Sequence, residues 1–129
     1  MTPRDLLRSE SAKWLGQADK DRIAAEALLV VEPSRSAFHS QQVAEKGLKA
    51  FLTARQISFH RTHDLADLGA QCAALDPSLD ATVREAAELT DYASAFRYPD
   101  APWEPDSTEA TAALATATRL LAEIRRRLA

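Results

Sequence analysis

The sequence predicts an all-α protein, an up-and-down bundle of about five helices. Apolar residues recur every three or four positions in five separate segments, which is the period of a helix with one buried face. No segment alternates apolar and polar residues as a half-buried strand does. Prolines stand between the segments, where they end one helix before the next begins. A chain of 129 residues is expected to form a single domain over 1–129.

Composition and charge exclude several classes of protein. The chain is 46% hydrophobic and 27% charged, with a net charge of −3, so no bulk basic field indicates nucleic-acid binding. No apolar run approaches the roughly 20 residues of a membrane span, and no membrane partner is expected. The single cysteine, Cys72, forms no internal disulfide and lies among apolar residues. We expect a cytoplasmic protein.

The first helix is predicted from about Ser9 to Val31. Asp21 lies in its apolar sector, where a core residue is expected. Pro33 separates this helix from the second, which begins with Ser34 or Ser36 as its N-cap and continues to about Gln56. So short a link makes the two helices antiparallel neighbours. The apolar face of the first helix consists of Leu7, Trp14, Ala18, Ala25, Leu28 and Leu29.

The second helix carries polar side chains on the face that its apolar residues mark as buried. Gln41 and Glu45 fall in the same sector, one turn apart. Burying them without partners costs on the order of 2 kcal/mol or more, so polar partners elsewhere in the chain are predicted. The apolar residues of that sector are Ala37, Ala44, Leu48, Phe51 and Leu52.

The opposite side of the second helix is mixed. His39 and Lys46 lie there, close to Val43 and Ala50 on the helical wheel. A mixed polar and apolar face is typical of a helix that packs against another protein chain. We therefore interpret this face as a contact with a second subunit.

The remaining helices follow a loop over 57–65. Thr62 is the expected N-cap of a third helix, which ends at Asp76. A fourth helix is predicted over 78–96, followed by an extended, proline-rich link and a fifth helix over 107–128. The arginines at 125–127 suit the C-terminal dipole of the fifth helix, and we interpret them as a solvated terminus.

Most familiar catalytic patterns are absent. His60 and His63 have only Asp64 near them at ligand spacing, so no metal site is expected. Cys72 has no charged neighbour to activate it as a nucleophile. There is no glycine-rich phosphate loop, and no cofactor is expected.

A dispersed polar group carries more information. It comprises Asp21, Gln41, Glu45 and the turn Arg97-Tyr98-Pro99-Asp100, whose arginine can reach a carboxylate across the bundle. These residues form either a buried network that fixes helix register or a pocket between helices. In the second interpretation Arg97 holds a phosphate.

Four blocks of the sequence together resemble a known family. They are Trp14 with Ala18-x-x-Asp21, Phe38-His39-x-Gln41-Gln42-x-x-Glu45-Lys46-x-Leu48-Lys49-Ala50, Thr62-His63-Asp64-Leu65, and Arg97-Tyr98-Pro99-Asp100. In this order they resemble the HEPN family (higher eukaryotes and prokaryotes nucleotide-binding domain). The resemblance implies a five-helix bundle, a homodimer, and a minimal nucleotidyltransferase as partner in a two-gene toxin–antitoxin module. The ligand-binding residues are then Asp21, Gln41, Glu45, Lys46, Lys49, His63, Arg97, Tyr98 and Asp100.

The resemblance also raises the question of an enzyme. Many members of the family are metal-independent ribonucleases that use an arginine, a spacer of four to six residues and a histidine. After Arg97 the corresponding positions hold Pro102, Trp103 and Glu104, so the histidine is missing. Arg97 remains a candidate catalytic residue, and His39 is the candidate for the missing acid or base, with His63 as an alternative.

Three functions therefore remain open. The chain is a HEPN-like subunit that binds a nucleotide, a nucleic acid or a nucleotidyltransferase partner. Alternatively, it is an endoribonuclease toxin with a displaced histidine. As a third alternative, it is a purely structural helical dimer.

Overall fold

The computed structural model describes residues 1–59, 61–94 and 104–129. Within these ranges the chain forms five α-helices and two 3₁₀ helices, and no strand. The predicted all-α bundle of about five helices is confirmed. The helices are α1 Pro3–Leu28, α2 Pro33–Ala54, α3 Leu65–Leu75, η1 Pro77–Leu79, α4 Asp80–Ala87, η2 Thr90–Ala93 and α5 Ser107–Leu128.

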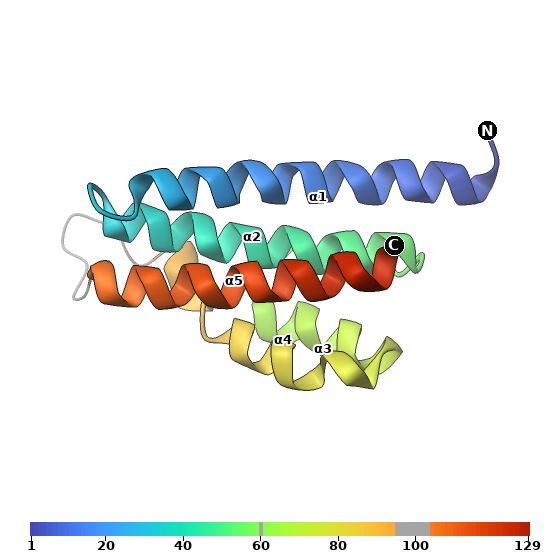
Figure 1. Cartoon of the computed structure of the whole chain (residues 1–129). Coiled ribbons are helices and arrows are strands. Elements are labelled where there is room, and N and C mark those ends of the chain that lie inside the picture. The colour runs from blue at the N-terminus through green and yellow to red at the C-terminus, as the bar shows by residue number, and fades with distance from the viewer. Residues whose placement is uncertain (60, 95–103) are drawn as a thin grey trace.

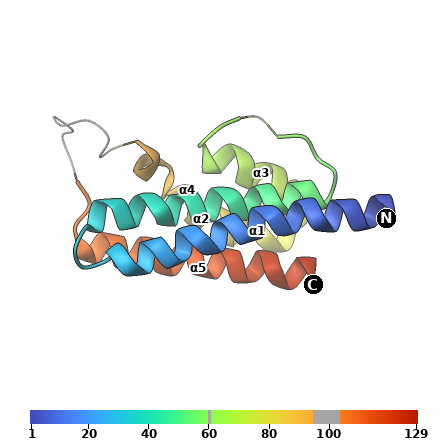
Figure 2. The same cartoon turned by 90° about the horizontal axis from the view of Figure 1, so that it is seen from above.

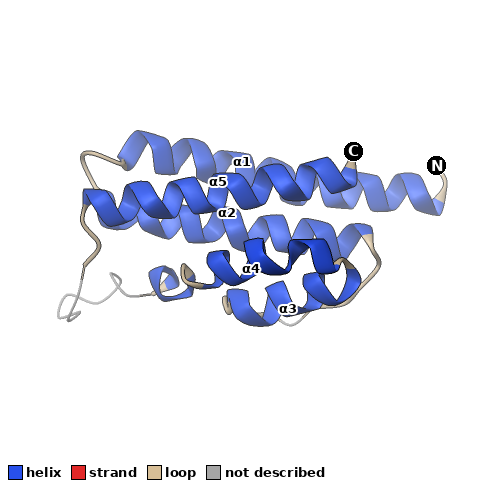
Figure 3. Cartoon of the chain, turned by 60° about the horizontal axis from the view of Figure 1, so that its bottom comes forward, coloured by secondary structure: helices blue, strands red, loops and turns tan. Residues whose placement is uncertain are grey.

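Helix α2 is the centre of the bundle. It packs against α1 on one side and against α5 and α3 on others, while α3 packs against α4 (Figure 1). The view from above shows α1 and α2 running antiparallel, with both chain termini at the same end of the bundle (Figure 2). The short helices α3 and α4 lie together beneath α2 and α5 (Figure 3).

Helix α1 begins six residues earlier than the predicted Ser9. Thr2 is its N-cap: the Thr2 hydroxyl accepts from the Asp5 amide at 3.1 Å, and the Asp5 carboxylate accepts from the Thr2 amide at 3.1 Å. This reciprocal capping box, with Pro3 as the first helical residue, is a start signal that the sequence contained. The predicted boundary was wrong because only the apolar period was followed.

Helix α2 begins at Pro33, not after a serine cap. Its N-cap position is Glu32, whose side chain makes no capping hydrogen bond. Ser34 and Ser36 are buried within the first turns, and the Ser36 hydroxyl donates to the Ala25 carbonyl oxygen at 2.6 Å. The prediction of a serine N-cap was therefore wrong, because Ser36 bonds the facing helix and not its own backbone.

A left-handed residue follows the end of helix α2. Gln56 has φ of 58°, in the region that favours glycine. The Ile57 amide donates to Leu52 O at 2.9 Å and the Gln56 amide to Thr53 O at 3.1 Å, which is the Schellman pattern. These two hydrogen bonds satisfy carbonyls that the end of the helix leaves without helical partners.

Helix α3 is capped by Asp64 and not by Thr62. Asp64 Oδ1 accepts from the amides of Ala66 at 2.9 Å and Asp67 at 3.4 Å. The Thr62 hydroxyl accepts instead from the Asp64 amide at 3.0 Å. That amide precedes Leu65, the first residue of α3, so Thr62 does not cap the helix. Asp is at least as good an N-cap as Thr, so both residues fit the sequence pattern. Asp64, which directly precedes the helix, is the one that caps it.

The predicted fourth helix over 78–96 is wrong in its length. α4 covers only Asp80–Ala87 and is flanked by η1 and η2. The Thr90 hydroxyl donates to Ala87 O at 2.8 Å, which occupies an acceptor that a continuing α-helix would use. The same hydroxyl accepts from the Leu65 amide at 3.2 Å. The Thr90 side chain therefore bonds the start of α3, and α4 ends before Thr90.

The core is continuous around α2. Cys72 is fully buried in it, its Sγ 3.7 Å from Leu48 O, and burial raises the pKa of the thiol to about 12. Among the described residues, no helix is both long and apolar enough to cross a bilayer. The largest fully buried apolar side chains are Phe51, Leu48, Leu52, Leu65, Leu68, Leu79, Leu120 and Ile124.

Candidate functional site

Asp21 of α1 binds two side chains of α2. Its Oδ1 lies 2.8 Å from His39 Nδ1, and its Oδ2 accepts from Lys46 Nζ at 2.6 Å. The carboxylate is 11% exposed, whereas the side chains of His39 and Lys46 are 28% and 21% exposed. A buried acid thus holds two basic groups at the surface of the α1–α2 face.

The α1–α2 contact corrects the interpretation of the mixed face of α2. Val43 and Ala50 on that face are fully buried within a single chain. The Ser11 hydroxyl of α1 donates to Ala50 O at 2.9 Å, and Asp21 contacts both His39 and Lys46. The predicted second-subunit contact was wrong for this face, because α1 of the same chain covers it.

Glu45 is the centre of a second polar cluster, on the side of α2 that faces the loop before α3. Its Oε1 lies 2.7 Å from His63 Nδ1 and accepts from Gln41 Nε2 at 3.1 Å. Its Oε2 accepts from Lys49 Nζ at 3.0 Å. Gln41 Nε2 also donates to His63 O at 3.3 Å, so the predicted need of Gln41 and Glu45 for polar partners is met.

The environment of Glu45 favours its ionised form. Burial raises the pKa of this carboxyl, but the hydrogen bonds from His63, Lys49 and Gln41 together outweigh burial and bring the pKa below its ordinary value. The Glu45 side chain is 5% exposed, whereas that of His63 is 59% exposed. As at Asp21, a buried carboxylate orients an imidazole that faces solvent.

Two aromatic rings enclose the ammonium of Lys49. Its Nζ lies 5.5 Å from the centre of the Trp14 ring and 5.6 Å from that of Phe59. The two rings meet edge to face, 6.0 Å apart. Sequence reasoning did not find Phe59, because a loop residue outside the helical period gives no signal of what it contacts. Lys49 is held by charge and by aromatic faces together, which makes it a structural residue of this cluster.

The structure separates the predicted polar constellation into two clusters. Asp21, His39 and Lys46 form one, and Glu45 with Gln41, Lys49 and His63 forms the other. His39 and Glu45 are six residues apart on α2, which places them about 9 Å apart along the axis and about 120° apart around it. Arg97, Tyr98 and Asp100 lie outside the described residues.

Each cluster presents an oriented imidazole. With Nδ1 donating to a carboxylate, the free nitrogen is Nε2, which can accept or donate a proton according to the charge of the ring. Neither Nε2 makes a hydrogen bond within the part of the chain that the structure describes. Those ranges also contain no group of three or more His, Cys, Asp and Glu side chains that could hold a metal ion.

The arginines at the end of α5 bridge helices. Arg125 donates to both oxygens of Asp19 on α1, at 2.8 Å and 2.5 Å. Arg127 donates to Asp76 Oδ2 at 2.9 Å and to Glu123 Oε2 at 2.6 Å. The interpretation of this run as a solvated terminus was therefore wrong for Arg127, whose side chain is 16% exposed, whereas Arg125 is 41% exposed and paired as well.

Comparison with known proteins places this geometry in a family. The HEPN domain model matches residues 11–127. The chain belongs to the HEPN family. This HEPN chain is also similar to the crystal structure of TT1696 from Thermus thermophilus, with 31% sequence identity and a TM-score of 0.75. That match covers 90% of this chain and 96% of the other. No curated protein matches the sequence.

Proposed function

We propose that this HEPN chain is a binding subunit that recognises the phosphate of a nucleotide or nucleic acid at the α1–α2 face, through His39 and Lys46. The observation that carries the proposal is the buried Asp21 carboxylate, which holds both basic side chains at fixed positions on the surface. A polar network that served only to join α1 and α2 has no need of an imidazole whose second nitrogen is unoccupied within the described residues.

The chemistry of the two groups suits a phosphate. Lys46 uses one N–H for Asp21 and keeps two more donors, and His39 Nε2 adds a third when the ring is protonated. Because Asp21 fixes both groups, little side-chain freedom is lost when an anion binds. Arg97, the first residue of the Arg97-Tyr98-Pro99-Asp100 block and charged at every physiological pH, is the further phosphate ligand that the family resemblance suggests.

The partners in this proposal come from the family resemblance. We include a minimal nucleotidyltransferase, expressed from a neighbouring gene, and a second copy of this chain. The first is tested by co-expression and co-purification of the two gene products, and the second by light scattering on the purified chain. If the chain is a monomer and binds no nucleotidyltransferase, both proposed partners are wrong. The proposal of a phosphate site at His39 and Lys46 is not affected by that result.

Binding at the α1–α2 face is tested with two probes, a fluorescent ATP analogue and a labelled oligouridine. The informative variants are His39→Gln and Lys46→Gln, and the matched control is Lys20→Gln, which removes the charge of an exposed lysine of α1. We expect each informative variant to weaken binding roughly tenfold, the value of one charge-assisted hydrogen bond. Lys46→Gln should also reduce the salt dependence of oligouridine binding by about one phosphate contact.

Two results would overturn this assignment. Equal affinity in His39→Gln, Lys46→Gln and the wild type places the phosphate elsewhere. Absence of any binding by the wild type, in a protein whose melting is otherwise normal, leaves a subunit that binds a nucleotidyltransferase or a purely structural dimer.

A second candidate, ribonuclease activity, is favoured by one specific observation. The Asp21–His39 pair supplies an oriented imidazole, which is the group that the sequence lacks after Arg97. In this alternative His39 transfers the proton and Arg97 stabilises the charge that develops on the phosphate.

The ribonuclease alternative is tested by incubating a mixed RNA substrate with the wild type, His39→Gln and Arg97→Ala, each sized in parallel. Cleavage by the wild type that both variants lose, with the assembly unchanged, supports catalysis. If His39→Gln cleaves as fast as the wild type, His39 is not the missing acid or base.

A further inference from the structure

A basic cavity lies at the other end of α2 from His39. Its walls come from the first turns of α1 and from the last turns of α2 and α5, and its volume is about 400 Å³. Arg55, in this cavity, is 16 residues from His39, which corresponds to about 24 Å along the α2 axis. The cavity is therefore independent of the phosphate face proposed above.

Four arginines line this cavity: Arg4, Arg8, Arg55 and Arg127. Arg4, Arg8 and Arg55 form no ion pair with a carboxylate of the described ranges. The nearest acid in sequence, Asp5, accepts hydrogen bonds from the amide and hydroxyl of Thr2. In a chain whose net charge is −3, this is a local concentration of positive charge, although, besides the hydrogen bonds from Thr2, the charge of Arg8 also lowers the pKa of the neighbouring Asp5.

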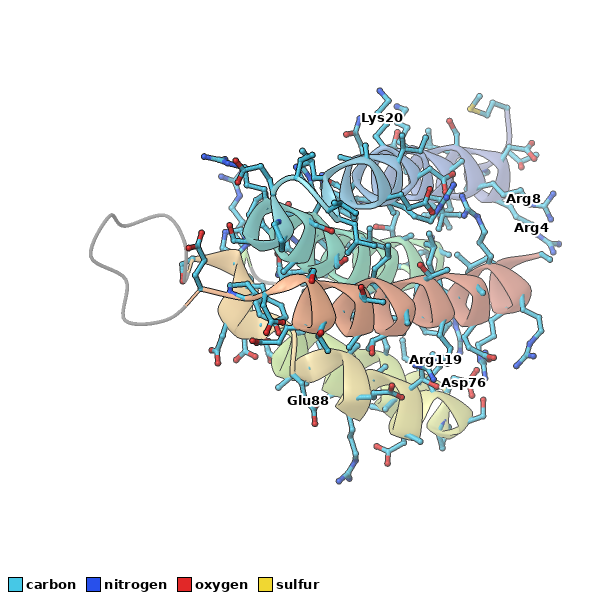
Figure 4. The ribbon with its side chains drawn as sticks, turned by 60° about the vertical axis from the view of Figure 1, so that its left-hand side comes forward. Arg4, Arg8, Lys20, Asp76, Glu88 and Arg119 are labelled. Atoms are coloured by element: carbon cyan, nitrogen blue, oxygen red, sulfur yellow. The ribbon has the colours of Figure 1, made fainter. Side chains whose placement is uncertain are left out.

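The position of Arg4 and Arg8 opposes the electrostatics of the helix. Arg4 lies in the first turn of α1, where the helix dipole favours acids and disfavours cations, and Arg8 lies in the second turn. They are also four residues apart, so their like charges repel by a few tenths of a kcal/mol. Figure 4 shows both side chains extending from the same end of α1. A bound anion removes both penalties.

Arg55 is held in place by an aromatic ring. Its guanidinium carbon lies 5.5 Å from the centre of the Phe51 ring, a cation–π contact that favours this position of the group. Arg127 also lines the cavity but is already paired with Asp76 and Glu123. Arg4, Arg8 and Arg55 are thus the groups available to an anion.

Apolar side chains complete the cavity. Leu7 and Leu15 of α1 and Leu128 of α5 lie beside the arginines. Arg4, Leu7, Arg8 and Leu15 fall within about 100° of one another around the α1 axis, so a single stripe of α1 presents both kinds of group. Helix α1 begins beyond the ends of α2 and α5 (Figures 1 and 2), and both Arg4 and Arg8 are exposed there.

We propose that this cavity binds a small phosphate monoester with an apolar body, the phosphate on Arg4, Arg8 and Arg55 and the body against Leu7, Leu15 and Leu128. A phosphate dianion offers three acceptor oxygens to three guanidinium forks. The cavity volume falls within the range of small-molecule sites, which are mostly apolar with a few placed polar groups.

The proposal is tested by calorimetric titration of the full chain with phenyl phosphate. The informative variant is Arg4→Gln with Arg8→Gln. The control is Arg84→Gln with Arg119→Gln, which removes the same charge from two exposed arginines outside the cavity. All four arginines are exposed, so both variants should fold. We expect roughly tenfold weaker binding for each cavity arginine removed, and less than about a twofold change in the control.

Two comparisons of ligands separate the parts of the site. Inorganic phosphate should bind more weakly than phenyl phosphate, because it lacks the apolar body. Adenosine 5′-monophosphate and octyl phosphate then distinguish a nucleotide from a lipid phosphate, and binding of either one that depends on Arg4 and Arg8 supports the proposal.

The proposal fails if the wild type does not bind phenyl phosphate, or if the cavity variant and the control bind it equally. It also fails if inorganic phosphate binds as tightly as phenyl phosphate. None of these results affects the His39 and Lys46 test, because even Lys46 is nine residues from Arg55, or about 14 Å along the α2 axis.

Discussion

His39 Nδ1 lies 2.8 Å from Asp21 Oδ1, and the other oxygen of the same carboxylate accepts from Lys46. One acid of α1 therefore bonds two positions of α2 that are seven residues apart, or about two helical turns. Because both contacts end on one carboxylate, they fix how α1 and α2 are rotated and shifted against each other.

Asp21→Asn should lower the free energy of unfolding by about 1–3 kcal/mol, because Lys46 and His39 then lose their charged partner in a mostly buried place. Urea denaturation measures this change. The control is Glu26→Gln on the same helix, whose ion pair with Arg22 is exposed and should contribute less than about 1 kcal/mol. Equal stability of the two variants would show that the Asp21 contacts do not hold the bundle together.

Glu45→Gln should make stability less sensitive to acid. Since the folded-state pKa of Glu45 lies below its unfolded value, its ionised form stabilises the fold above the unfolded pKa of about 4.3. That contribution is lost as the pH falls through the folded-state pKa. The wild type should therefore exceed Glu45→Gln in stability most clearly above about pH 5, and the two should converge in stronger acid.

Urea denaturation at a series of pH values tests the Glu45 prediction. Glu26→Gln serves as the control and should remain parallel to the wild type throughout. If the difference between wild type and Glu45→Gln is constant from neutral pH into strong acid, the hydrogen bonds from His63, Lys49 and Gln41 do not depend on the charge of Glu45.

Two glycines in helices should respond in opposite directions to substitution by alanine. A Cβ at Gly69 would lie 2.9 Å from Val83 Cβ, whereas one at Gly16 would meet nothing within 4 Å. Gly69→Ala should cost about 1–3 kcal/mol, because α3 and α4 must move apart. Gly16→Ala should stabilise by about 0.5–1 kcal/mol through helix propensity. Thermal unfolding of the two variants distinguishes these effects. A higher melting temperature in both would mean that α4 shifts to accommodate the new methyl group without loss of stability.

Gln56→Gly should stabilise the protein by up to about 1 kcal/mol. The φ of 58° at this residue is strained for a side chain and free for glycine, and the Schellman hydrogen bonds use only backbone atoms. Gln17→Gly, in the exposed middle of α1, makes the same chemical change and should cost about 1 kcal/mol. Opposite shifts in melting temperature are expected, and a loss at position 56 contradicts the prediction.

The helices could be predicted from the sequence because apolar residues at a helical period record which faces are buried. Their ends were less certain, since several residues compete for each cap. Thr62 and Asp64 both suit the start of α3, and only the geometry decides between them. The break after α4 depends on Thr90, whose hydroxyl joins Ala87 to Leu65, a contact between segments 25 residues apart that no local pattern contains.

The polar residues of the candidate site could be named from the sequence, but their pairing could not. A helical wheel places Asp21 on the inner face of α1 without saying which residue of α2 it meets. That depends on the rotation of one helix about the other. The wheel did separate His39 and Lys46 from Gln41 and Glu45. It could not show that α1 of the same chain lies against the face of α2 that carries His39 and Lys46.

The central position of α2 has a consequence for the order in which the native protein opens. Its amides are enclosed by α1, α3 and α5, so hydrogen–deuterium exchange there requires separation of the whole bundle. The start of α1 extends past the ends of its neighbours, so it can fray while the rest stays folded. Deuterium should therefore enter around Arg4 and Arg8 within the native state, and should reach Leu48 only through molecules that have unfolded completely.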